Sequence, residues 1–112
     1  MRLRHRMWIL LPLLAAPLMI ASGKGDATKG KALFGRCAMC HGNSGEGNAA
    51  IGKALNVAMP DLSSQVVQSL DDAALKKVIV EGKGKMQAVK LSDAEAEDVI
   101  AFIRSLKKPP SK

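Results

Sequence analysis

The feature that most constrains this chain is the pentad Cys37-Ala38-Met39-Cys40-His41, which contains both cysteines of the 112-residue sequence. The spacing C-x-x-C-H is the attachment motif of c-type haem. In that chemistry the two thiols add to the two haem vinyl groups, and the histidine binds the iron from the proximal side. The pentad therefore predicts one haem c per chain, covalently held by Cys37 and Cys40, with His41 as an axial ligand.

Three other interpretations share the C-x-x-C core. A thiol–disulfide oxidoreductase carries the motif in a βαβ context, which this sequence does not predict. A structural zinc site needs four ligands, and only His41 would join the cysteines, since His5 lies in the predicted leader. A chance C-x-x-C before a histidine is the third and least favoured interpretation.

Residues 1–23 have the pattern of a secretory signal peptide. Basic residues at positions 2–6 precede an apolar run at 7–20 and small residues at 21–23. A retained anchor is disfavoured, because the run contains two prolines and is shorter than the roughly 20 residues that span a bilayer. We therefore expect export to the periplasm, removal of residues 1–23, no membrane association afterwards, and a single domain at 24–112.

The expected mature chain has little material for a hydrophobic core. Its only aromatic residues are Phe34 and Phe102, and domains of this size usually need a disulfide, a metal or a cofactor to fold. Loss of the three arginines of the leader lowers the formal net charge from +7 to +4. A net charge this small, with few aromatic side chains for stacking on bases, argues against nucleic-acid binding. It remains consistent with a preference for acidic protein partners.

Three helices are predicted, and no segment alternates like a strand, so the fold class is all-α. The first runs from about residue 27 into Cys37 with Asp26 as its cap, and the second runs from Asp71 or Asp72 to residue 81. The third covers residues 92–107, where a serine and a glutamate three residues apart form a capping box. Residues 42–60 are rich in Gly, Asn and Ser, and predict a long loop with at most one helical turn.

A second axial ligand must come from a residue other than histidine, because His41 is the only histidine of the expected mature chain. Methionine is the main candidate, with lysine or an empty position as minor ones. Met86 is favoured, because it lies in a glycine-containing segment after a helix that would form the far wall of the site. Met59, in the middle loop, remains the alternative.

The sequence resembles the class I cytochromes c of bacteria across the expected mature chain. The resemblance rests on residues 30–34 leading into the pentad, on 60–62, on 82–86, and on the apolar stripe from Leu91 to Leu106. It implies a small cytochrome c fold with three to four helices around one covalently attached haem. It also implies that the first and last helices cross near Gly30, Phe34 and Phe102. Two departures are Gln87, where a proline commonly follows the distal methionine, and Phe102, where the family often has tyrosine or tryptophan.

These observations predict a soluble periplasmic electron carrier and not an enzyme. An iron held by His41 and Met86 would have no open position for a substrate. It would transfer single electrons between larger redox proteins, such as an oxidase, a reductase or a photosynthetic complex, with the carrier a monomer. The alternative is a five-coordinate haem protein that binds gas or reduces peroxide. Lys83, Lys85 and Lys90 flank the expected ligand, and we expect them to guide docking of a partner.

Overall fold

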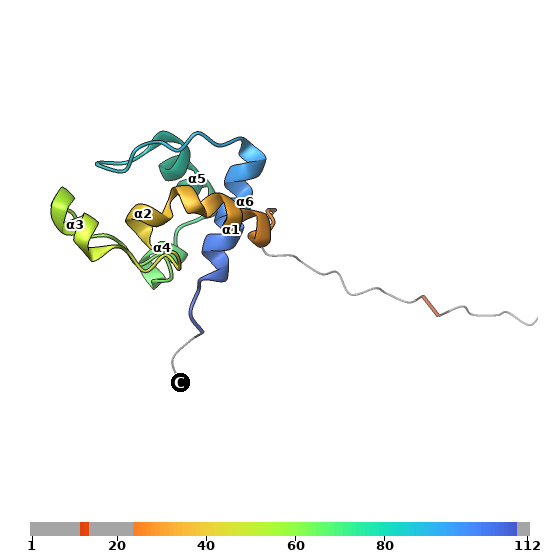
Figure 1. Ribbon diagram of the computed structural model, residues 1–112. Coiled ribbons are helices and arrows are strands. Elements are labelled where there is room, and N and C mark those ends of the chain that lie inside the picture. Colours follow the sequence, from red (N-terminus) through yellow and green to blue (C-terminus); the bar gives the residue numbers. More distant parts are fainter. Residues whose placement is uncertain (1–11, 14–23, 110–112) are drawn as a thin grey trace, which may run out of the picture.

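The computed structural model describes residues 12–13 and 24–109, and within them the protein is all-α (Figure 1). The α-helices are α1 (Ala27–Leu33), α2 (Ala38–His41), α3 (Ala49–Leu55), α4 (Gln65–Gln68), α5 (Asp72–Glu81) and α6 (Asp93–Ser105), and a 3₁₀ turn, η1 (Phe34–Arg36), joins α1 to α2. The predicted fold class is confirmed. Apart from residues 12 and 13, the predicted signal peptide lies outside the described residues. No helix in the described part of the chain is long and apolar enough to cross a membrane.

The three predicted helices begin at the residues that their caps indicate. Asp26 caps α1 by accepting hydrogen bonds from Thr28 N and Lys29 N at 2.8 and 3.1 Å. The expected helix 27–37 is α1 followed by η1, since helices often tighten into a 3₁₀ turn at their ends. Asp71, rather than Asp72, caps α5 through Ala74 N at 2.7 Å.

The last helix, α6, has the predicted capping box. Ser92 Oγ accepts from Glu95 N at 3.2 Å, and the Glu95 carboxylate accepts from Ser92 N at 3.0 Å. These hydrogen bonds lower the pKa of Glu95 below its usual value. The two bonds satisfy two of the free amides at the helix start.

Besides α2, which lies within the pentad, two short helices were not predicted from the sequence. The middle loop contains α3, which is seven residues long rather than one turn, and Asn48 caps it by accepting from Ala50 N and Ile51 N. Ser64 caps the four-residue α4 through Val67 N at 3.4 Å. Both helices follow a good capping residue but bury only one residue each, so an apolar stripe does not reveal them.

The core forms where α1 crosses α6. At Gly30 the two backbones approach so closely that a Cβ atom would overlap the Asp98 carbonyl and lie 3.0 Å from Phe102 Cβ. The Phe34 and Phe102 rings pack beside this crossing, with centroids 4.9 Å apart and planes inclined at 58°. This confirms the crossing that the family resemblance implies, and it explains why a glycine is tolerated inside α1 despite its low helix propensity.

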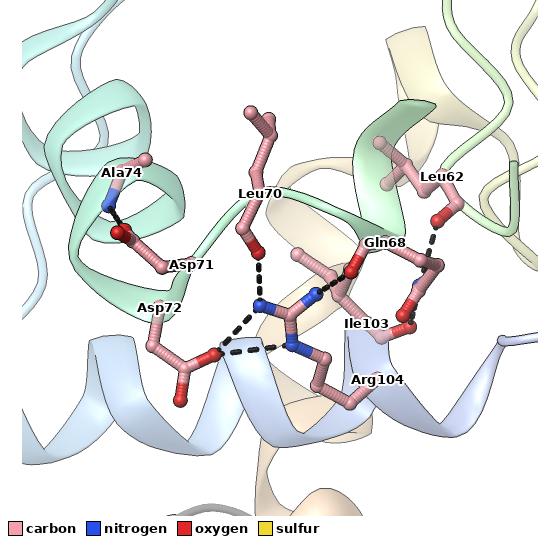
Figure 2. Close-up of polar contacts among 8 residues, drawn as sticks. All are labelled: Leu62, Gln68, Leu70, Asp71, Asp72, Ala74, Ile103 and Arg104. Atoms are coloured by element: carbon pink, nitrogen blue, oxygen red, sulfur yellow. Dashed lines mark hydrogen bonds and ion pairs between the residues drawn. The ribbon is translucent and has the colours of Figure 1, made fainter. Parts of the chain in front are cut away.

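Arg104, near the end of α6, forms hydrogen bonds to the connection between α4 and α5 (Figure 2). Its guanidinium donates to the carbonyls of Gln68 and Leu70 at 2.9 and 2.5 Å, and to Asp72 Oδ1 at 2.8 and 3.1 Å. The Gln68 side chain continues the network by donating to the carbonyls of Leu62 and Ile103 at 2.9 and 2.8 Å.

We expect Arg104→Met to lower the free energy of unfolding by about 2 kcal/mol, because two carbonyls lose a charged donor. Asp72→Asn is the matched control and should cost less than about 1 kcal/mol, since exposed ion pairs contribute little. Urea denaturation of the two variants measures both values. Equal losses would show that the ion pair, rather than the carbonyl contacts, makes the contribution.

Candidate functional site

The pentad lies on one helical turn that begins at the C-terminus of η1. Cys37 N donates to the Phe34 carbonyl at 2.8 Å, and His41 N donates to the Cys37 carbonyl at 2.9 Å. Residues three and four positions apart lie on one face of a helix. The two thiols, at i and i+3, and the imidazole, at i+4, are therefore presented on the same side, and both cysteines are free thiols.

The following loop closes the end of this short helix. Gly47 N donates to the His41 carbonyl at 2.7 Å, and Asn48 N donates to the Cys40 carbonyl at 2.9 Å. The Asn48 side-chain amide also donates to the Met39 carbonyl at 3.1 Å. The last carbonyls of α2 are thereby satisfied. Asn48 both caps α3 and fixes the pentad, a role whose only sequence signal is an asparagine directly before an Ala-Ala-Ile run.

Burial shifts the pKa values of two residues of the pentad, Cys37 and His41. Burial raises the pKa of the Cys37 thiol, partly offset by the nearby Arg36 guanidinium, with a smaller upward contribution from Cys40. A thiol–disulfide oxidoreductase needs the opposite, a cysteine with a lowered pKa. Burial lowers the pKa of His41, which favours the neutral imidazole that a metal ion requires.

The donor chemistry of the site fits a haem. His41 Nδ1 is buried and has no hydrogen-bond partner among the described residues. Six half-buried apolar residues pack against the core, and one of them belongs to the pentad: Leu33, Cys37, Val80, Val89, Leu91 and Leu106. Where a large flat apolar group covers such side chains, each Å² of apolar surface removed from water contributes about 25 cal/mol.

Met86 lies in a tight turn between α5 and α6. Lys83 and Met86 exchange two backbone hydrogen bonds, each of 3.0 Å, across Gly84 and Lys85. Gly84 has a φ of +57° at the first central position of this turn, where a side chain would strain the backbone. The methionine is half-buried, and its backbone position is fixed by the turn rather than by a helix.

The alternative ligand, Met59, packs against its own loop. A Cβ atom at Gly47 would lie 3.2 Å from Met59 Cβ, and a Cβ atom at Gly52 would lie 3.1 Å from Met59 Cγ. Met59 therefore fills the space between the two glycines, as methionines often do in irregular cores.

The described residues do not bring together a conventional cluster of metal-binding side chains. No group of three or more His, Cys, Asp or Glu side chains in residues 24–109 converges as metal ligands would. The sulfur and nitrogen donors of the pentad all come from one helical turn and do not enclose a common centre. A zinc site needs four ligands around one centre, so the zinc interpretation is disfavoured. The arrangement suits a group that brings its own equatorial ligands.

Sequence reasoning missed two long-range contacts near the site. Arg36 Nη1 donates to the Lys90 carbonyl at 3.3 Å, and Lys85 Nζ donates to the Leu55 carbonyl. Both join the side of the molecule that carries the pentad to the segment that carries Met86. No local sequence signal indicates either contact.

Comparison with known proteins agrees with this geometry. The Cytochrome c family model matches residues 27–107, a segment that begins at the start of α1 and ends just beyond α6. A search of curated proteins found no significant match to the chain. Because the family match covers far more than half of the chain, the protein belongs to the cytochrome c family and is a small all-α, haem-based electron carrier of the class I type.

Proposed function

We propose that the protein is a soluble periplasmic electron carrier with one haem c attached through Cys37 and Cys40 and with His41 and Met86 as the axial ligands. The observation that carries the proposal is the presentation of two free thiols and an imidazole on one face of a single turn, inside a segment that the family model matches. When bound, the haem supplies a one-electron couple at its iron.

The protein's own residues bind and orient this group. The two cysteines prevent its loss, and the neutral His41 offers a nitrogen lone pair to the metal. Met86 offers a thioether from a turn that is closed by two backbone hydrogen bonds between Lys83 and Met86. A methionine ligand raises the reduction potential of the haem. Half-buried apolar side chains that pack against the core, among them Leu33 just before the pentad and Val89 just after Met86, are available to contact the haem and keep water from it.

Two filled axial positions leave no site for a substrate, which is why we propose a carrier and not an enzyme. An absorption spectrum of the oxidised protein tests this proposal. We expect a low-spin spectrum with the weak long-wavelength band that methionine–iron bonding gives in this family. A high-spin spectrum, together with fast binding of carbon monoxide by the reduced protein, would instead support the five-coordinate alternative.

We further propose that residues 1–23 are removed on export and that residues 24–112 form the working domain. The basic head, the short apolar run and the small residues at 21–23 support this. The partners would be larger redox proteins that give and accept single electrons, with the carrier acting as a monomer.

Lys83 and Lys90 are exposed on the segment around Met86, so we expect them to steer an acidic partner. Lys83→Glu combined with Lys90→Glu should slow bimolecular electron transfer with the native partner by about tenfold at low salt. The difference should nearly vanish at about 1 M salt, where the Debye length is about 3 Å. Stopped-flow kinetics measures both rates.

The matched control is Lys29→Glu, an exposed lysine on α1, and it should leave the rate near that of the wild type. If the double variant and the control react equally fast at low salt, the lysines around Met86 have no role in docking.

A further inference from the structure

Lys85 makes a contact that a purely solvated docking charge would not make. Its ammonium donates a hydrogen bond to the backbone carbonyl of Leu55, 30 residues earlier in the chain. Leu55 is the last residue of α3, and Lys85 is a central residue of the turn that carries Met86. The contact therefore joins two segments that the sequence keeps far apart.

The Leu55 carbonyl is suited to accept this bond. At the end of α3, Val57 N donates to the Gly52 carbonyl at 2.9 Å and Asn56 N donates to the Lys53 carbonyl at 3.2 Å. The final carbonyl, that of Leu55, lies beyond the reach of these capping amides and at the negative end of the helix. A lysine there satisfies an orphan acceptor and interacts favourably with the helix dipole.

The two segments that Lys85 joins belong to the two sides of the proposed haem site. The α3 segment is fixed to the pentad, because Asn48, its cap, is hydrogen-bonded to the carbonyls of Met39 and Cys40. The segment that carries Met86 is instead hydrogen-bonded to α5, because Val89 N, three residues beyond the turn, donates to the Ile79 carbonyl at 2.8 Å. Lys85 thus links the side that carries His41 to the side that carries Met86.

We propose that Lys85 is a positioning residue whose bond to the Leu55 carbonyl ties the Met86 turn to α3, and so slows displacement of Met86 from the iron by small external ligands. This inference rests on the proposed axial role of Met86. It also assigns Lys85 a role different from the docking role that we expect of the exposed Lys83 and Lys90.

The test compares the holoprotein with its Lys85→Ala, Lys85→Arg and Lys83→Ala variants. Imidazole binding to the oxidised protein is followed at constant pH by loss of the methionine–iron band. Lys85→Ala should bind imidazole about fivefold faster than the wild type, the change expected from losing a cation at an exposed helix C-terminus. Lys85→Arg should restore most of the wild-type rate, and Lys83→Ala should match the wild type.

Amide hydrogen exchange of the same proteins separates this inference from the proposed ligation. In Lys85→Ala, the amides of Val57 and Met86 should exchange faster than in Lys83→Ala, because the hydrogen bond between α3 and the Met86 turn is lost. Equal exchange and equal imidazole rates in the two alanine variants would overturn the role of Lys85. A wild type without the methionine–iron band would overturn the axial role of Met86, and with it the claim that Lys85 protects that bond.

Discussion

Met86→Ala should abolish the methionine–iron band of the oxidised protein and lower the reduction potential by roughly a few tenths of a volt, within the range of about 0.8 V that axial ligands control in haem proteins. The reason is the loss of a thioether that favours the reduced iron. The Lys83–Met86 turn is held by backbone bonds, so the substitution should leave its shape intact. Spectroscopy and a redox titration of the purified variant measure the two effects.

Met59→Ala is the matched control. This side chain packs against Gly47 and Gly52 in its own loop, so its loss should reduce stability but leave the band and the potential near their wild-type values. The reverse pattern, with the band lost only in Met59→Ala, would transfer the axial role to Met59.

Gly30→Ala should destabilise the fold by about 3 kcal/mol or more. A methyl group at this position overlaps the Asp98 carbonyl, which belongs to the backbone of α6 and cannot turn aside. The two helices would have to separate, and the packing of Phe34 on Phe102 would loosen with them. A loss of this size is a large fraction of the total stability of a small domain.

Gly35→Ala provides the comparison for this prediction. Apart from its chain neighbours and the backbone of its own helical turn, no atom lies within 4 Å of a Cβ placed at Gly35. The variant should therefore be as stable as the wild type or more stable by up to about 1 kcal/mol. Urea denaturation of both haem-loaded variants gives the two values. Equal stability of Gly30→Ala and Gly35→Ala would contradict the close crossing of α1 and α6.

The parts of the fold that the sequence predicted are those with strong local signals. The α6 helix has a capping box and a long apolar stripe, and α5 lies between an aspartate cap and Gly82. The pentad was likewise readable, because its chemistry depends on spacing within five residues. The role of Gly30 in the close crossing of α1 and α6 was predicted only from the family resemblance. Helix propensity alone indicates that a glycine at this position destabilises the helix.

The parts that the sequence did not predict depend on contacts between distant residues. The α3 helix is short and buries only Gly52. Its start is held by Asn48, which accepts a hydrogen bond from Ala50 N and donates one to the Met39 carbonyl. The bonds from Arg36 to Lys90 and from Lys85 to Leu55 span 54 and 30 residues. Lysine and arginine are common on surfaces, and only the fold shows which of them reach a carbonyl.

The most direct test of the account is mass spectrometry of the protein matured in a host that exports it and attaches haem. The account predicts the mass of a chain beginning near residue 24 plus one haem, with the added mass on a peptide containing Cys37 and Cys40. It also predicts that acidified acetone does not extract the haem. An unmodified pentad peptide, with the haem passing into acidified acetone, would contradict covalent attachment.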